Sequence, residues 1–295
     1  MVISMHLFVL SIGFGLVTAS VLALSAVGLT LQFGITNYAN FAYGDFLTLG
    51  AYLTWTFNGA LGWNIWLSLV MGSLLVGVVA LVISQVILDP FARRGGPVVY
   101  ILIITFGLSL IMSNSILAIW GAEYKEYNVG LESPVNVGPL SLTANQLGII
   151  GIAVAMMIAI HLLLTRTKVG KAMRAMSDDT SLAAVSGIPT ERITALVWII
   201  SGVLAGLGGG VLALNVVTFD SSLGVTFLFV IFAAVILGGI GKPYGAMLGA
   251  LVIGLAVEVS AAFFPSQYKL DTAFVILVLI LLFRPQGLLG VVGKA

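Results

Sequence analysis

Long apolar runs alternate with short polar or glycine-rich connections along almost the whole chain. A helix of about 20 apolar residues crosses the ~30 Å hydrocarbon layer of a bilayer, and most of these runs reach or approach that length. The pattern predicts an all-α polytopic membrane protein with eight or nine transmembrane helices. The runs lie at about 8–30, 39–57, 64–88, 97–120, 146–164, 193–214, 226–241, 246–264 and 271–283.

The number of spans stays open between eight and nine. The linker LQFGITNY (31–38) carries no charge, and the runs at 226–241 and 271–283 are short. Any of these runs can therefore be a broken or re-entrant segment, provided that protein or water satisfies the backbone groups that leave the helix. We treat residues 1–295 as a single transmembrane domain.

Lys and Arg gather on alternate connections, which predicts the orientation of the chain. Cytoplasmic loops carry the excess of basic residues in membrane proteins. Placing the basic connections in the cytoplasm assigns ten of the twelve Lys and Arg residues to that side and leaves Lys125 and Lys269 outside. The C-terminus is then cytoplasmic, and with nine spans the N-terminus lies outside. The ten cytoplasmic cations are Arg93, Arg94, Arg166, Lys168, Lys171, Arg174, Arg192, Lys242, Arg284 and Lys294.

Composition supports the membrane assignment and excludes one class of partner. Hydrophobic residues make up 60% of the chain and charged residues 8%, with a mean hydropathy of +1.18. Soluble domains hold only about 45 to 50% apolar residues. A net charge of +1 gives no basic field for nucleic acid, so membrane lipid is the expected surrounding.

Glycines at a spacing of four, Gly202, Gly206 and Gly210, favour close helix packing within this subunit or against a second one.

Motifs for catalysis, metal binding or ATP binding are not evident. The nearest approach to a phosphate-binding loop is ILGGIGKPYG, where Gly241 and Lys242 are followed by Pro243 in place of Ser or Thr. His6 and His161 are the two histidines, and neither lies in a metal-ligand spacing. We therefore expect no catalytic residue, no metal and no cofactor on this chain.

A few polar side chains fall at predicted membrane depth: Asn40, Asp45, Asn114, Asn215 and Glu258. An acidic group at the centre of a membrane helix costs about 2.5 to 3.5 kcal/mol on insertion scales, so each needs a partner or a hydrated path. Two hypotheses stay open at this point. The carboxylates line a water-filled path, or neighbouring hydroxyls and water satisfy them near an interface.

The connection over residues 165–192, TRTKVGKAMRAMSDDTSLAAVSGIPTER, holds five of the twelve cations. Its pattern predicts a short cytoplasmic helix through TSLAAVS. Asp178 or Asp179 can cap the start of that helix, and Gly187 can take the left-handed position that closes it. Ile188 then folds back as the hydrophobic partner, and Pro189 prevents continuation.

Small residues form one face of this predicted helix: Ala183, Ala184 and Gly187. A small face on an exposed helix suits insertion into a cleft of another protein, because nothing bulky blocks close approach. The alternative is a solvated basic loop that lies against lipid headgroups. Thr190 is expected to cap the helix that follows.

Four stretches in this order resemble the LivH-type permease of branched-chain amino acid ABC importers along nearly the whole chain: GLTLQFGITNYANFAYGDFLTLGAYL, KVGKAMRAMSDDTSLAAVSGIPTERI, AAVILGGIGKPYGAMLGALVIG and RPQGLLG. In that family the cytoplasmic loop carries a version of the importer EAA motif. The resemblance implies that the short helix is the coupling helix seated in a groove of an ATPase subunit. The residues implied in coupling are Asp179, Ala183, Ala184, Gly187 and Ile188.

Two positions depart from the family pattern. Ser181 stands where an acidic residue often opens the motif, and Tyr43 stands where the family usually has histidine. A role that needs a titratable imidazole is therefore not carried over to Tyr43. We expect this region to line the translocation path. The candidate path residues are Asn40, Tyr43, Gly44, Asp45 and Glu258.

The resemblance implies one permease subunit of an ATP-driven importer in the inner membrane. The implied partners are a LivM-type sister permease, two cytoplasmic ATPase subunits that bind ATP and Mg²⁺, and a periplasmic substrate-binding protein. Branched-chain amino acids are the implied cargo, and urea or short amides are the alternative. Two hypotheses of other classes are an ion-coupled secondary transporter, for which Asp45 and Glu258 are a meagre set of titratable groups, and a membrane anchor.

Overall fold

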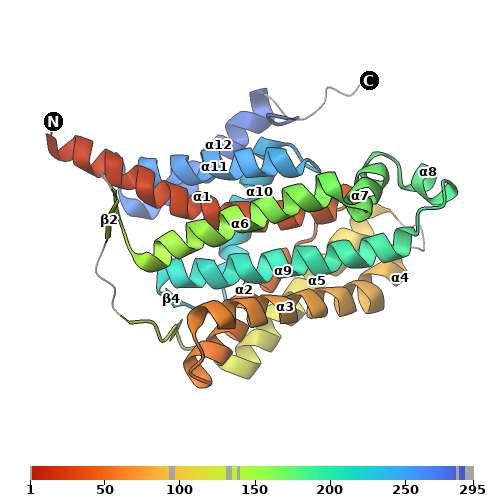
Figure 1. Ribbon diagram of the computed structural model, residues 1–295, viewed down its shortest axis with the longest axis horizontal. Helices are drawn as coiled ribbons and strands as arrows, with labels where there is room; N and C mark the ends of the chain where they lie inside the picture. Colours follow the sequence, from red (N-terminus) through yellow and green to blue (C-terminus); the bar gives the residue numbers. More distant parts are fainter. Residues whose placement is uncertain (1, 93–96, 131–134, 138–139, 284–285, 290–295) are drawn as a thin grey trace. The chain divides into compact units, whose positions relative to one another are not determined.

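The computed structural model describes residues 2–92, 97–130, 135–137, 140–283 and 286–289, and it is mostly helical (Figure 1). Apolar helices dominate because a backbone in a membrane must satisfy its hydrogen bonds within its own segment. The described helices are α1 Val2–Thr36, α2 Tyr43–Trp55, α3 Ile65–Ile83, α4 Asp89–Ala92, α5 Val98–Trp120, α6 Ala144–Arg166, α7 Lys168–Asp178, α8 Thr180–Val185, α9 Thr190–Val216, α10 Leu223–Gly238, α11 Pro243–Ser260 and α12 Lys269–Phe283. Shorter elements are π-helical turns at Thr56–Ala60 and Ser84–Leu88, a 3₁₀ turn at Ser266–Tyr268, and strands β1 Lys125–Glu126, β2 Val135–Val137, β3 Leu140–Leu142 and β4 Thr218–Phe219.

Helices occupy all nine places where the apolar pattern predicts a span, but they differ in length. Six of the described stretches are long and apolar enough to cross a membrane. The helices α2, α10 and α12 are shorter, with 13, 16 and 15 residues. At 1.5 Å per residue, α2 is only about 20 Å long. The span predicted at 39–57 starts too early, because α2 begins only at Tyr43, after a non-helical segment.

Contacts group the chain into two compact units. Unit 1 comprises Met1–Val27, Val129–Met157 and Phe229–Ala295. Unit 2 comprises Gly28–Asn128 and Ile158–Leu228. The sequence predicts one permease domain, and the structure resolves that domain into two groups of helices.

In unit 2, the helices α2, α3 and α9 pack against one another (Figure 1). Glycines make these contacts close. A side chain at Gly202 would meet Gly77 and Ala80 of α3, and one at Gly206 would meet Ser73. The glycine row of α9 therefore packs within this chain, which decides between the two readings of its spacing. We call the glycine-lined contacts among these three helices the α9 seam.

The strand β1, which follows α5, pairs antiparallel with β4, which follows α9, and both lie in unit 2. Tyr127 follows β1 and is buried; its hydroxyl donates to the carbonyl of Ala51, 3.1 Å away. Burial raises the pKa of Tyr127 well above its usual range, so the phenol stays neutral and keeps this hydrogen bond. The contact ties the connection after α5 to α2.

Unit 1 is held by close packing of a similar kind. Gly238 of α10 lies against Gly245 of α11, and Gly254 of α11 lies against Ala19 of α1. The segment after α12 returns to α10, where the amide of Leu288 donates to the carbonyl of Leu237 at 2.7 Å. The strands β2 and β3 pair antiparallel in the same unit.

Candidate functional site

The connection between α6 and α9 contains two helices, and the sequence predicts only the second. The first, α7, begins after Thr167, whose hydroxyl accepts a hydrogen bond from the amide of Gly170 at 2.9 Å. Its buried side is formed by Gly170, Met173 and Met176, while its basic side chains are exposed. Sequence reasoning missed this helix, although the spacing of Gly170, Met173 and Met176 by three is the signal that finds it.

The second helix, α8, has the predicted start and end. The carboxylate of Asp179 accepts a hydrogen bond from the amide of Leu182 at 2.9 Å, which confirms an N-cap. Gly187 has φ +84°, in the left-handed region. The amide of Gly187 donates to Ala184 and that of Ile188 to Ala183, at 3.0 and 3.1 Å. This pair of bonds is the Schellman arrangement, which satisfies the last carbonyls of a helix.

The exposed surface of α8 differs from the small face that the sequence predicts. Ala183 is buried, whereas Ala184 and Gly187 are exposed. Two large apolar side chains stand out beside them, with Leu182 65% exposed and Val185 84% exposed. Sequence reasoning missed Leu182 and Val185. Two large apolar residues three positions apart on a capped helix outside the membrane spans would have indicated an exposed apolar surface.

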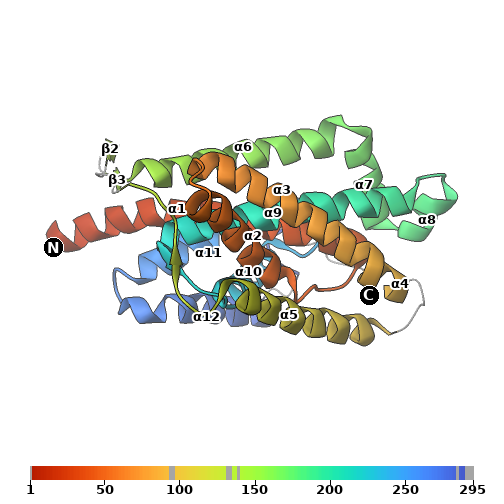
Figure 2. The same ribbon diagram turned by 90° about the horizontal axis from the view of Figure 1, so that it is seen from below.

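The start of α9 corrects one more expectation. Thr190 is the first residue of α9, and its side chain does not serve as the cap. The N-cap position is occupied by Pro189, which forms no side-chain hydrogen bond. The cap assignment failed because α9 begins at Thr190 itself, one residue earlier than a cap by Thr190 requires. Figure 2 shows α7 and α8 at the N-terminal end of α9.

The segment between α1 and α2 brings together four of the five candidate path residues. Asn37, just after α1, has φ +55°, which ends the helix. Asn40 is buried, and its side-chain oxygen accepts a hydrogen bond from the amide of Ala42 at 3.1 Å. Tyr43 is also buried and lies against Gly28 of α1, where a Cβ would overlap its hydroxyl. Protein thus encloses Asn40 and Tyr43, whereas Asn37 at the start of the segment is exposed.

Gly44 and Asp45 form the first turn of α2. A side chain at Gly44 would collide with the backbone of Gly224, so only glycine permits this approach. The carboxylate of Asp45 is buried and accepts hydrogen bonds from the hydroxyls of Ser109 and Ser113 on α5. Of the two hypotheses for Asp45, this geometry supports satisfaction by neighbouring hydroxyls.

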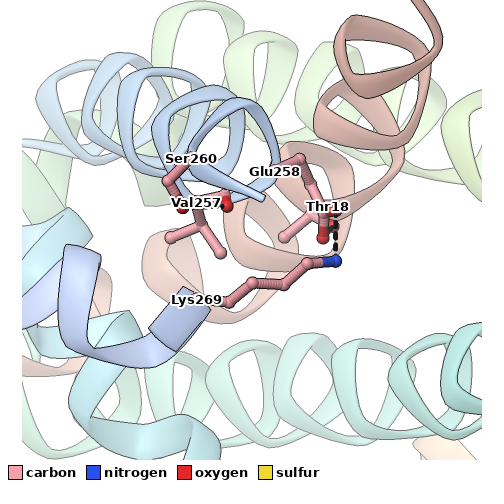
Figure 3. A network of polar contacts seen from close by, with 5 residues as sticks. All are labelled: Thr18, Val257, Glu258, Ser260 and Lys269. Carbon is pink, nitrogen blue, oxygen red and sulfur yellow. Dashed lines mark hydrogen bonds and ion pairs between the residues drawn. The ribbon is translucent and has the colours of Figure 1, made fainter. Parts of the chain in front are cut away.

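Glu258, the fifth candidate, lies in unit 1 and has a charged partner. Figure 3 shows Lys269 of α12 reaching Glu258 of α11, with Thr18 of α1 beside them. The ammonium lies 2.6 Å from one carboxylate oxygen, and the hydroxyl of Thr18 donates to the other at 3.0 Å. The side chains of Glu258 and Lys269 are 14% and 34% exposed. An ion pair therefore offsets the desolvation of both charges.

The same unit contains the stretch that resembles a phosphate-binding loop. Gly241 has φ +78°, and α11 starts directly afterwards with Pro243 in its first turn. Proline has no amide hydrogen, so this helix start lacks one of the donors that cradle a phosphate. Within the described ranges, no three His, Cys, Asp or Glu residues gather as a metal site.

Comparison with known proteins gives concordant matches. Residues 11–283 match the family described as "Branched-chain amino acid transport system / permease component". The chain is 30% identical to the high-affinity branched-chain amino acid transport system permease protein BraD of Pseudomonas aeruginosa, over 94% of both chains. It is 29% identical to LivH of Escherichia coli (strain K12), over 94% of this chain and 93% of LivH.

Two more distant likenesses extend this result. LivM of Escherichia coli (strain K12), a permease protein of the same kind of transport system, is 25% identical over 89% of this chain and 66% of LivM. The solved structure of PsaBC from Streptococcus pneumoniae in complex with Fab superposes with a TM-score of 0.51 at 14% identity. The match covers 92% of this chain and 91% of that chain, and it shows a common fold.

Proposed function

The chain belongs to the family of permease components of branched-chain amino acid transport systems, and we propose that it carries these amino acids through the inner membrane into the cytoplasm. It is a multi-pass membrane subunit of an ABC importer. The names of its relatives favour branched-chain amino acids over urea or short amides as cargo. A permease that is one component of a transport system fits an ATP-driven importer better than a single-chain, ion-coupled secondary transporter.

The work of the importer is divided among several chains in this proposal. A sister permease of the LivM type completes the membrane part, since LivM resembles this chain over most of its length. Two cytoplasmic ATPase subunits bind ATP and Mg²⁺, and a periplasmic protein delivers the cargo. This chain itself holds no cofactor. The C-terminus and the connection over residues 165–192 face the cytoplasm, as the distribution of basic residues favours.

The observation that carries the proposal is the surface of α8. A rigid, capped helix stands outside the spans α6 and α9 and presents exposed Leu182 and Val185 beside the small residues Ala184 and Gly187. Apolar side chains exposed to water beside a surface open to close approach are typical of a docking site. We assign this surface, which we call the α8 docking surface, to a groove of an ATPase subunit. Asp179 and Ile188 hold the helix in shape.

The test combines surface variants with a charge control. In the purified complex, Ala184→Trp, Gly187→Trp and Val185→Asp should weaken ATPase binding about tenfold or more. The tryptophans obstruct close approach, and the aspartate would lose its hydration in an apolar contact. Gly187→Trp also strains a left-handed residue, so Val185→Asp is the cleaner variant. The control is the pair Lys168→Gln and Lys171→Gln, exposed on α7, which should leave binding within about twofold.

Two measurements read out the result. Affinity capture of the ATPase subunits reports docking, and leucine-stimulated ATP hydrolysis in proteoliposomes reports coupling. Leucine uptake against urea uptake by the parent complex tests the cargo. The docking assignment is wrong if the three α8 variants bind and couple as the parent does, and loss of binding only in the α7 control would assign the contact to the basic face of α7.

Transport is also proposed to depend on the candidate path residues Asn40, Tyr43, Gly44, Asp45 and Glu258. Asn40 lies between α1 and α2, and Tyr43, Gly44 and Asp45 begin α2. The burial and hydrogen bonds of Asn40 and Asp45 mean that they support the path through the helices they hold in place.

A further inference from the structure

The helix α5 has two unlike faces. Its inner face is fixed to α2 by Asp45, which accepts hydrogen bonds from Ser109 and Ser113, one helical turn apart. Thr105, Leu108, Met112 and Ile116 are buried on this side. Two bonds to one carboxylate fix the rotation of α5 about its own axis, because both serines must face the same residue of α2.

The other face of α5 carries an exposed amide. At 100° per residue, Asn114 lies about 120° around the helix from the mean direction of Ser109 and Ser113. Asn114 is exposed, as are Leu110 and Ile111 one turn before it. Two turns before it lies Gly107, where an added Cβ would meet nothing within 4 Å. We call the face formed by Gly107, Leu110, Ile111 and Asn114 the α5 outer face.

Asn114 is inside the apolar span and not at its end. Six residues, or about 9 Å, separate it from Trp120, the last residue of α5. Its Nδ2 donates to the carbonyl of Leu110 at 2.7 Å, and this bond does not use the side-chain oxygen. An amide that faces hydrocarbon loses its water without compensation, and polar side chains in membrane helices therefore face the bundle interior or a water-filled cavity.

The exposed side of α3 gives a comparison with a helix for which lipid is the expected neighbour. The exposed residues of α3 are all leucine or valine, among them Leu74, Val78 and Val82. The α5 outer face differs by having a polar amide and a glycine two turns apart. Water in a hydrated passage would form hydrogen bonds with the amide of Asn114. Gly107, which has no side chain, leaves space for such a passage beside α5.

We propose that the α5 outer face lines the passage for the amino-acid cargo, with Asn114 offering its amide to the polar ammonium and carboxylate groups of the cargo. Asp45 is a positioning residue in this scheme, because it acts on the passage only by setting the rotation of α5. The inference rests on the proposed transport function, but its structural part, water access to Asn114, can be tested without any transport.

The first experiment measures water access with single cysteines, since the natural chain contains none. In the assembled complex in lipid nanodiscs, Asn114→Cys should react with a hydrophilic, membrane-impermeant thiosulfonate at least about tenfold faster than Val78→Cys. A thiol in apolar surroundings has a raised pKa, and one unit reduces the reactive thiolate about tenfold. Leucine should slow the labelling of Asn114→Cys and leave that of Val78→Cys unchanged.

The second experiment tests the positioning role of Asp45 by the same labelling. Asp45→Asn keeps an oxygen that accepts from one serine hydroxyl, and its NH2 group can donate to the other, so labelling at position 114 should stay within about twofold of the parent rate. Asp45→Leu, or Ser109→Ala combined with Ser113→Ala, should lower that rate severalfold without changing the rate at Val78→Cys. A change at both cysteines would instead indicate general unfolding and would contradict a positioning role.

Equal labelling rates for Asn114→Cys and Val78→Cys would overturn the proposal, because Asn114 would then face lipid or a dry protein contact. Leucine uptake by the parent complex is measured separately. Fast labelling of Asn114→Cys together with no uptake of branched-chain amino acids would retain the passage and reject the proposed cargo.

Discussion

The ion pair of unit 1 allows a quantitative prediction about Lys269→Met. Removing one partner of a fully buried ion pair costs about 3 to 5 kcal/mol, whereas fully exposed pairs contribute about 0.2 to 1 kcal/mol. The two side chains lie between these limits, with Glu258 mostly covered and Lys269 about one third exposed. Lys269→Met should therefore lower the free energy of unfolding by about 1 to 3 kcal/mol, because Glu258 keeps only the hydrogen bond from Thr18.

The effect should be reversible by a second change. In Glu258→Gln with Lys269→Met the uncompensated charge is gone, and Thr18 can still donate to the amide oxygen. Most of the lost stability should return, which gives a coupling energy of about 1 to 2 kcal/mol in a double-mutant cycle. The free energies would be measured by equilibrium unfolding of the purified subunit in mixed micelles, for the parent, both single variants and the double variant.

Leucine uptake by the same four proteins separates two roles of Glu258. If the pair only holds α1, α11 and α12 together, uptake should recover with stability in the double variant. If Glu258 also contributes to the path, stability should recover and uptake should remain low. A single variant Lys269→Met that unfolds within about 0.5 kcal/mol of the parent would refute the reasoning, since that is the ordinary effect of a surface substitution.

Three further predictions concern orientation, packing and capping. Ser177→Cys, exposed on α7, should resist an impermeant thiol reagent in whole cells, whereas Glu123→Cys, exposed after α5, should react; the reverse pattern would invert the topology. Gly209→Ala places a Cβ on the backbone of α2 and should lower the free energy of unfolding in micelles by about 1 to 3 kcal/mol. In the control Gly151→Ala the added Cβ meets no neighbour, so the free energy of unfolding should change little. Equal effects of the two changes would contradict the close packing at the α9 seam. Asp179→Ala removes the cap of α8 and should destabilise this helix by about 1 kcal/mol, seen as faster amide exchange in α8; unchanged exchange would show that the cap is dispensable.

Sequence reasoning succeeded where the physical cause is local. Asp179, Gly187 and Pro189 act through the backbone within a few residues, so the start and the end of α8 could be predicted from their order alone. The expectation for Thr190 failed although its cause is also local. The helix α9 already includes Thr190 as its first residue, so the N-cap position falls to Pro189, which has no side-chain acceptor.

The environment of Asp45 could not be predicted because its partners are distant in sequence. Ser109 and Ser113 are separated from it by 64 and 68 residues and lie within another apolar run. A polar residue in such a run can face a path, a partner helix or an interface, and only the rotation of each helix decides among these. The exposure of Asn114 and the burial of Asp45 depend on that rotation, as does the pairing of Glu258 with Lys269.

The α9 seam also determines how a force would travel through this part of the molecule. At Gly209 the backbone of α9 meets the backbone of α2, and at Gly206 α9 meets Ser73 Cα and the short side chain of Val76 on α3. With contacts this close, α9 cannot slide along α2 and α3 without steric overlap. The helices α2, α3 and α9 should therefore move as one rigid body. The helix α8 is joined to the N-terminal end of α9 through Gly187 and Pro189. Since α9 has 27 residues and is about 40 Å long, a tilt of about 5° moves its far end by about 3.5 Å.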